Sequence, residues 1–183
     1  RAGRYHHRQF HHHAQGQRVA VSHDILSTAG SGTYTVGPGV TSITIGLLGA
    51  GGSPGGGGMY CEYGPISVTP GQTFNYQVGV QGGTQGDPAS AAGTADTWFK
   101  DFQWYFAQGS GSGSNQLGGH TAATAHATPT IFNRGGNQGN QPANNGGSGG
   151  GGAAGPNGRG GDGGVSNTWP FSGAGGGGGA TGG

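Results

Sequence analysis

Short segments in which apolar and polar residues alternate are the clearest pattern along the chain. The run S-I-T-I-G-L-L at Ser42–Leu48 alternates Ile43 and Ile45 with polar neighbours, and Phe74 and Tyr76 repeat the same spacing further on. A period of two is typical of a strand with one buried face. The pattern predicts four strands, at Thr33–Val36, Ser42–Leu48, Tyr60–Thr69 and Thr73–Val80.

A short turn sequence lies between the first two of these strands, and another lies between the last two. Gly37-Pro38-Gly39 lies between the first two predicted strands, and Pro70-Gly71 lies between the last two. Proline presets its own φ and glycine accepts a positive φ, so both sequences favour tight turns. The sequence therefore predicts two strand–turn–strand units, joined through a glycine loop, in a small antiparallel β-sheet with little or no α-helix.

Aromatic residues concentrate in one stretch, residues 98–106 (W-F-K-D-F-Q-W-Y-F). Each aromatic side chain buries about 150–250 Å², so we expect this stretch to supply much of the core or of a subunit interface. Read as one strand, it has two faces: Trp98, Phe102, Trp104 and Phe106 on one, and Phe99 and Tyr105 on the other. The candidate contacts with a partner are Trp98, Trp104 and Tyr105, together with Trp169 and Phe171, which are isolated between glycine tracts.

Glycine recurs at every third position in three parts of the chain. A period of three is the turn of the polyproline II helix, which rises about 3.1 Å per residue and has no internal hydrogen bonds. Glycine in one column lets such helices approach closely, so we expect packed polyglycine II helices, with a flexible glycine-rich linker as the alternative. The packing glycines of this expectation are Gly49, Gly52, Gly55, Gly58, Gly149, Gly152, Gly155, Gly158, Gly161, Gly164, Gly176 and Gly179.

Helices of this kind need neighbours. Ordering each backbone residue costs roughly 1–2 kcal/mol, and glycine loses more conformational freedom than other residues. Side chains in the glycine segments bury almost nothing, so hydrogen bonds between helices or association of subunits must compensate. The sequence thus predicts several bundled helices and favours a homo-oligomer.

The chain is poor in charge, with 49 glycines among 183 residues, 7% charged residues and a net charge of +1. Its basic residues gather at the start, where residues 1–18 contain four arginines, five histidines and no acid. Such an arm is expected to dock onto an acidic surface or to be clamped by a neighbouring subunit. The anchoring candidates in the arm are Arg1, Arg4, Arg8, Phe10 and Arg18.

The histidines of the arm do not predict a metal site. Zinc sites usually need four converging ligands that are themselves held by hydrogen bonds, and residues 1–18 contain neither Cys nor acid. We expect a contact arm whose charge depends on pH, with no metal and no cofactor.

Sequence patterns typical of catalysis and nucleic-acid binding are weak. Matches to glycine-containing motifs carry no information at this glycine frequency, and no Walker-type G-K-[ST] occurs. The two R-G-G segments, which begin at Arg134 and Arg159, carry too little charge for RNA. No apolar run approaches 18 residues, and a single Cys excludes an internal disulfide framework. We expect neither an enzyme, nor a nucleic-acid-binding protein, nor a membrane span.

The order of strands, turns and glycine runs resembles the glycine-rich domain of bacteriophage tail-fibre, tail-tip and adhesin proteins. The similar runs are G-T-Y-T-V-G-P-G-V-T-S-I-T-I-G-L-L-G-A-G-G (Gly32–Gly52), the G-G-G-G-M-Y-C-E-Y that follows, and I-S-V-T-P-G-Q-T-F-N-Y-Q-V-G-V (Ile66–Val80). In that family a T-V-P-x-G-V-T turn leads to a glycine run and then to a V-x-V-T-P-G-Q-x-Y-x-V-x-V-G hairpin. Gly37 departs from that pattern, and Phe102–Thr130 match nothing in it.

The resemblance implies a virion protein with packed polyglycine II helices, often trimeric, that acts in host-surface recognition or in building the tail tip or capsid decoration. Its expected partners are other virion proteins through the N-terminal arm, further copies of itself, and a host-surface glycan or protein. The alternative is a secreted glycine-rich structural protein of a cell wall or matrix.

The expected fold is mainly β, a small antiparallel sheet followed by a polyglycine II helix bundle. Its expected regions are a basic and histidine-rich anchoring arm (1–29), a β domain with the aromatic cluster (30–132) and a polyglycine II region (133–183).

Overall fold

A computed structural model describes residues 22–52, 55–84, 93–110, 118–119, 126–139 and 149–164. The strands are β1 (Gly30–Thr35), β2 (Ser42–Leu48), β3 (Tyr60–Ser67), β4 (Thr73–Val78), β5 (Thr97–Phe99), β6 (Tyr105–Ala107) and β7 (Ile131–Asn133). They form a four-stranded sheet in the order β1-β4-β5-β6 and a three-stranded sheet in the order β2-β3-β7, with antiparallel pairing throughout. The described residues contain no α-helix, so the prediction of a mainly β chain with little helix is confirmed.

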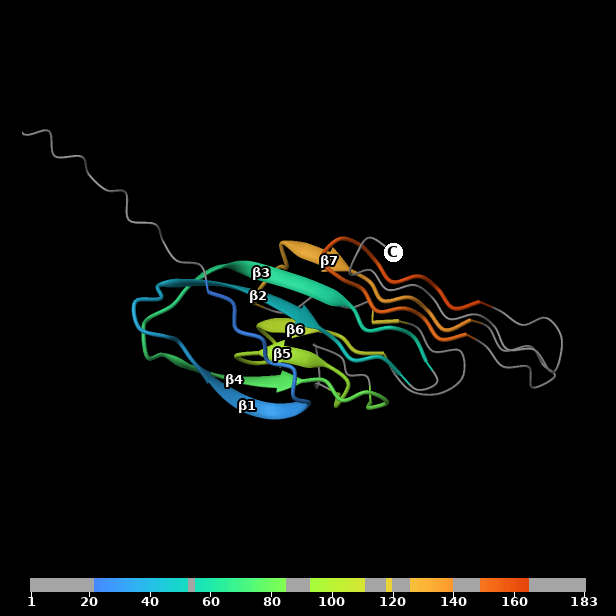
Figure 1. Cartoon of the computed structure of the whole chain (residues 1–183), viewed down its shortest axis with the longest axis horizontal. Coiled ribbons are helices and arrows are strands. Elements are labelled where there is room, and N and C mark those ends of the chain that lie inside the picture. Colours follow the sequence, from blue (N-terminus) through green and yellow to red (C-terminus); the bar gives the residue numbers. More distant parts are fainter. Residues whose placement is uncertain are drawn as a thin grey trace, which may run out of the picture.

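The two sheets lie face to face as a β-sandwich, with the core between them (Figure 1). Tyr63 of β3 crosses from one sheet to the other: its hydroxyl donates to the Phe106 carbonyl (2.7 Å) and accepts from the Phe106 N–H (3.2 Å). Its ring also meets the Tyr105 ring edge-on, 5.3 Å between centroids. The buried core cluster contains Val36, Leu47, Met59, Cys61, Tyr63, Val68, Phe74, Phe99, Tyr105 and Ala107.

The first four strands are one antiparallel ribbon that bends in the middle. β1 pairs with β4 in one sheet, and β2 pairs with β3 in the other. Backbone hydrogen bonds continue across the bend: Val36 N–H donates to the Gln72 carbonyl (2.8 Å), and Val68 N–H donates to the Thr41 carbonyl (3.0 Å). One half of the ribbon therefore lies in each sheet.

The predicted strand–turn–strand units are wrong as pairs, and two sheets replace the single small sheet. Pro38-Gly39 and Pro70-Gly71 are the central residues of two four-residue turns, and the second turn is closed by Gln72 N–H donating to the Thr69 carbonyl (3.0 Å). Their glycines have φ values of +76° and +81°, as in type II turns. Type II turns splay the flanking strands, because their twist does not match that of a hairpin. Each turn therefore passes the chain to the opposite sheet.

The aromatic stretch, predicted as one strand, forms the β5–β6 hairpin instead. Lys100, directly after β5, takes a φ of 68° and begins the reversal of the chain. Across the hairpin Trp98 pairs with Phe106, and Phe99 pairs with Tyr105. The expected grouping by face therefore holds for these four residues, whereas Phe102 and Trp104 lie in the turn between the two strands. The sequence pattern did not predict β7.

Burial makes Cys61 a core residue and not a reactive thiol. Its side chain is fully buried, and burial raises the pKa of the thiol from 9.0 to about 12, although a hydrogen bond with Tyr63 acts in the opposite direction. Burial also raises the pKa of the Tyr63 hydroxyl. Both groups are neutral in the folded protein and lose their protons more readily once the chain unfolds.

We expect the free energy of unfolding to fall as the pH rises from about 9 towards 12, because the folded chain retains the Cys61 proton that the unfolded chain releases. Below about pH 9 the contribution of the Cys61 thiol to the free energy of unfolding is fully present. Urea unfolding at a series of pH values and constant ionic strength measures it. The Cys61→Ala variant should decline less steeply, and equal slopes for the two proteins would contradict the role given to this thiol.

Candidate functional site: the glycine array

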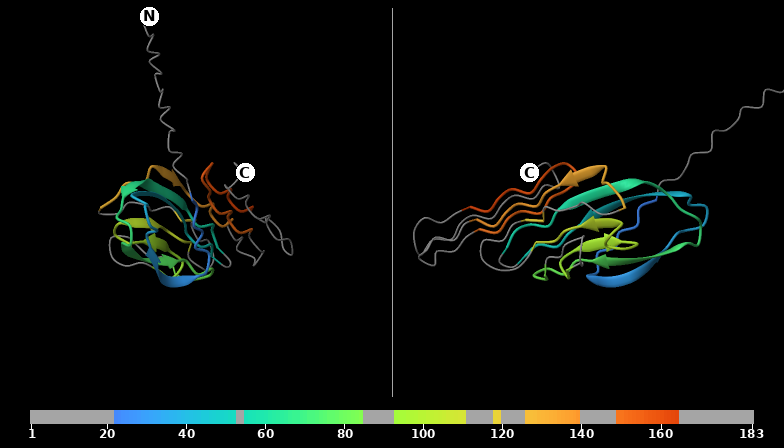
Figure 2. Two further views of the ribbon diagram at one scale, coloured as in Figure 1. Left: turned by 60° about the vertical axis from the view of Figure 1, so that its left-hand side comes forward. Right: turned by 180° about the vertical axis from the view of Figure 1, so that it is seen from behind.

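At one end of the sandwich the strands continue into a set of glycine-rich segments that lie side by side (Figures 1 and 2). We call this set the glycine array. Its segments are residues 49–52, 55–59, 108–110, 118–119, 134–139, 149–154 and 160–164. The array thus unites glycines that follow β2 with glycines from the last third of the chain.

Hydrogen bonds between the segments repeat every three residues. Gly136 and Gly139 both donate to the segment 149–154, at 2.8 and 2.9 Å. Gly149 and Gly152 donate in turn to the segment 160–164, at 3.0 and 2.8 Å. These neighbours run antiparallel. Parallel neighbours show the same spacing: Gly151 and Ala154 donate to Gly55 and Gly58, and Gly160 and Gly163 donate to Arg134 and Asn137.

The segment 55–59 lies at the centre of the array. Its residues are all buried, and its backbone exchanges hydrogen bonds with five other segments: 49–52, 108–110, 118–119, 134–139 and 149–154. A strand within a β-sheet bonds to two neighbours in one plane. This segment is therefore surrounded by hydrogen-bonded neighbours and does not belong to a sheet.

Close backbone contact explains why this segment is glycine. A Cβ added at Gly56 would lie 2.6 Å from the backbone nitrogen of Gly118, and one added at Gly57 would collide with the Gly152 carbonyl. A Cβ at Gly58 would collide with a third neighbour, the segment 49–52. Consecutive residues thus face different segments, and each needs the same absence of a side chain.

Most of the glycines predicted to pack lie in the array. Two of them, Gly155 and Gly158, instead close a tight turn between the last two segments, and Gly176 and Gly179 lie outside the described residues. The predicted glycines whose backbone groups bond other segments are Gly49, Gly52, Gly55, Gly58, Gly149, Gly152, Gly161 and Gly164.

Several of the closest backbone approaches occur at glycines that the predicted column omits. These are Gly56, Gly57, Gly135, Gly136, Gly139, Gly151, Gly160 and Gly163. Their signal in the sequence is the presence of adjacent glycines, since a segment enclosed on several sides needs glycine at successive positions and not only at every third one.

Asp96 ties the sandwich to the array. Its side chain is fully buried, and its carboxylate accepts hydrogen bonds from the backbone N–H groups of Gly109 (2.8 Å) and Gly93 (2.5 Å). These residues continue from β6 and lead into β5, so the carboxylate joins the two sides of the hairpin where it enters the array. No pattern in the sequence distinguishes Asp96 from the other acidic residues of the chain.

The predicted aromatic contacts have different surroundings. Tyr105 belongs to the buried core, and Trp98 is half-buried, with an indole nitrogen that has no hydrogen-bond partner. Trp104 is covered in part by its own chain: the Lys100 ammonium lies 3.3 Å from its ring centroid, and the His126 ring stacks on it at 4.8 Å. The structure therefore does not bring these residues together as one open aromatic platform.

The remaining candidate residues lie outside the described part of the chain: Arg1, Arg4, Arg8, Phe10, Arg18, Trp169 and Phe171. Within the described residues, no group of three or more His, Cys, Asp or Glu side chains is arranged to hold a metal ion. The same residues include no helix long and apolar enough to cross a membrane.

Comparison with protein families, with curated proteins and with solved structures gave no match.

Substitution of Gly57 by alanine should destabilise the protein by about 1–3 kcal/mol or more, because the new methyl group collides with the Gly152 carbonyl in a fully enclosed position. Gly158→Ala is the matched control, since nothing lies within 4 Å of a Cβ at that glycine. Its effect should stay within about 0.5 kcal/mol. Urea unfolding measures the stability of both variants. Equal free energies of unfolding for Gly57→Ala and Gly158→Ala would contradict the close packing around Gly57.

Asp96→Ala should also destabilise the fold, because it removes the carboxylate that accepts hydrogen bonds from two backbone N–H groups, and loss of the partner of a buried donor costs about 1–3 kcal/mol. Asp101→Ala provides the control, since that carboxylate is exposed and accepts a hydrogen bond from the Gln103 N–H (2.9 Å). Thermal unfolding followed by circular dichroism compares the variants. A loss no larger for Asp96→Ala than for Asp101→Ala would count against the joining role of Asp96.

Proposed function

We propose that the glycine array is a bundle of polyglycine II helices. The observation that carries this proposal is the segment 55–59, which exchanges backbone hydrogen bonds with five other segments. A helix with three residues per turn directs successive peptide groups to different sides, and this accounts for a hydrogen-bond period of three. It also accounts for neighbours that run in both directions, because such a helix needs no common strand plane.

A bundle of this kind supports a mechanical function. Each segment is braced by hydrogen bonds in several directions, and close backbone contact leaves no space for the chain to bend locally. The strands of the sandwich lead directly into these segments, so a force applied to one part is transmitted through the backbone to the other. A stiff projection from a sandwich base is suited to display or attachment.

We further propose that the protein is a structural component of a bacteriophage virion, of the tail-fibre, tail-tip or head-decoration type. Two features support this: the resemblance of Gly32–Val80 to the glycine-rich domains of such proteins, and an array that follows the strands as the resemblance implies. In this proposal residues 1–18 anchor the chain to other virion proteins. The array projects from the particle and contributes to attachment at the host surface through a glycan or protein.

Removal of residues 1–18 should abolish incorporation into phage particles, because the anchoring arginines are lost while the sandwich and the array remain. Mass spectrometry of purified particles measures incorporation. The thermal unfolding midpoint of the isolated truncated chain should equal that of the full chain, which separates loss of anchoring from loss of folding. Normal incorporation of the truncated chain would contradict the anchor, and absence of the full chain from particles would contradict the virion assignment.

A further inference from the structure

Among the described residues, no β-strand fills the position next to β2 in the sandwich. In the three-stranded sheet, β2 and β3 face β5 and β6 of the other sheet, and no strand of the smaller sheet faces β1 or β4. β2 pairs only with β3, so its other edge is open among the described strands. A fourth strand next to β2 would complete the smaller sheet and cover the inner face of β4 and β1.

A groove of about 1010 Å³ occupies this position. It runs along the whole of β2, and its opposite wall includes Tyr34, Tyr76 and Val78. β2 carries no charge and no proline, the two devices that commonly protect an open edge. The groove therefore offers unpaired backbone on one side and apolar side chains on the other, the two features that bind an extended strand.

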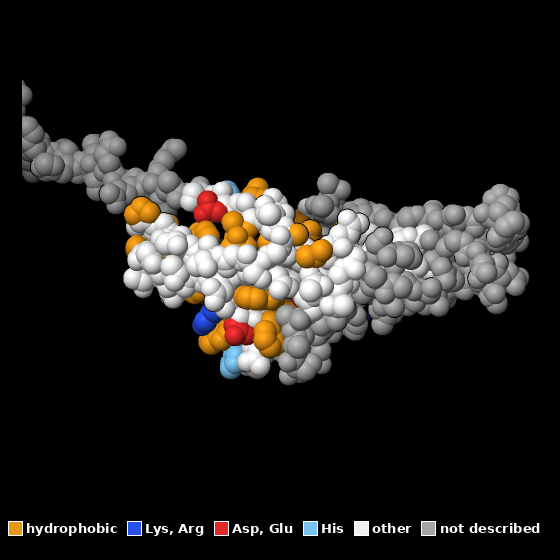
Figure 3. Space-filling model, turned by 90° about the horizontal axis from the view of Figure 1, so that it is seen from below, with side chains coloured by type: hydrophobic (Ala, Val, Ile, Leu, Met, Phe, Trp, Pro, Cys, Tyr) orange, Lys and Arg blue, Asp and Glu red, His pale blue; other side chains and the backbone are white. Residues whose placement is uncertain are grey.

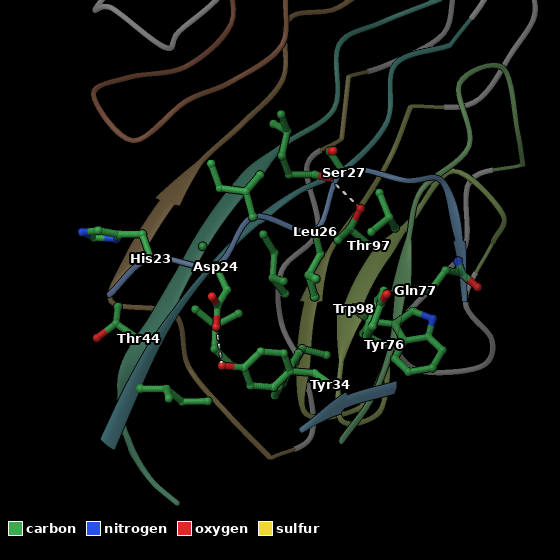
Figure 4. A pocket seen from close by; sticks show the side chains of 18 of the residues that line it. His23, Asp24, Leu26, Ser27, Tyr34, Thr44, Tyr76, Gln77, Thr97 and Trp98 are labelled. Atoms are coloured by element: carbon green, nitrogen blue, oxygen red, sulfur yellow. Dashed lines mark hydrogen bonds between the residues drawn. The ribbon is translucent and has the colours of Figure 1, made fainter. Parts of the chain in front are cut away.

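The segment Ser22–Ser27 crosses the groove without becoming that strand (Figure 4). Asp24 accepts a hydrogen bond from the Tyr34 hydroxyl (2.9 Å), but no backbone hydrogen bond joins the segment to β2. Its apolar side chains remain exposed, Ile25 by 87% and Leu26 by 42%, and Leu48 of β2, which also lines the groove, is exposed by 48%. Charged side chains form only small separate spots on the face shown in Figure 3. The groove is thus crossed but not filled.

We propose that the groove binds Val19–Val21 of a second copy of this chain as a strand paired with β2. This segment has the alternating apolar pattern Val-Ala-Val, and it is as long as β5, β6 and β7. It immediately precedes Ser22, a residue that lines the groove. Within one chain the segment would have to reverse direction beside Ser22–Ser27, where no glycine or proline supports a turn. A neighbouring copy meets no such constraint, and exchange of an identical segment is a low-cost route to an oligomer.

The oligomeric state of the purified full chain tests this proposal. Sedimentation equilibrium should show an assembly of two or more copies for the wild type. The Val19→Asp/Val21→Asp variant should associate at least ten-fold more weakly, because two carboxylates would enter an apolar groove. Ala2→Asp/Ala14→Asp is the matched control, since it adds the same charge to the same arm outside the segment, and it should associate as the wild type does. A single-chain mass for the wild type, or equal association of the two double variants, would overturn the proposal.

Cross-linking locates the contact. A chain with Ala20→Cys is mixed with a chain with Thr44→Cys, which places a thiol on exposed β2, and the mixture is oxidised. A disulfide-linked pair of chains is expected. Thr33→Cys, on exposed β1, replaces Thr44→Cys in the control and should give at least ten-fold less product. Equal yields at the two positions would overturn the assignment of the groove. Because these measurements use the isolated chain, they do not depend on whether the protein belongs to a virion.

Discussion

Contact between peptide groups with no Cβ between them is the interaction on which this molecule depends. Around Gly57 the backbone of one segment lies against the carbonyl oxygen of another, at a separation that a methyl group would prevent. An ordinary domain gains stability by burying apolar side chains, but here a large part of the chain has none to bury. Hydrogen bonds between enclosed backbones replace that contribution, and they require glycine wherever two segments approach.

The sandwich provides the conditions under which such bonds form. Its aromatic core and the bent ribbon of β1 to β4 fix the positions at which the strands leave the sheets. Segments that start from fixed neighbouring points lose less conformational entropy when they pack than free glycine chains would. The Asp96 carboxylate strengthens this junction, because it holds backbone from both sides of the β5–β6 hairpin. The side-chain core and the glycine array are therefore parts of one structure.

The sequence predicted the local elements well and their partners poorly. Alternation located β1 to β4 within a few residues, since strand character depends on near neighbours. The pairing of those strands depended on the Pro-Gly turns, whose φ values separate the strands and prevent hairpins. The aromatic stretch shows a similar limit, because nothing in its composition announces a reversal at Lys100. In the array, the period of three was visible in the sequence. The enclosure of 55–59 by five segments was not, because it arises from parts of the chain more than 90 residues apart.

A hydrogen-bond repeat of three residues also limits how the length of the glycine array can change. Insertion of one or two residues into a segment would move every later donor away from its acceptor, whereas insertion of three restores the original alignment. In the polyglycine II helices that we propose, matched triplets added to neighbouring segments would lengthen the array in steps of about 9 Å while the sandwich at its base stayed as it is. Length then becomes a property that natural variation can adjust in discrete increments, separately from the fold that supports it.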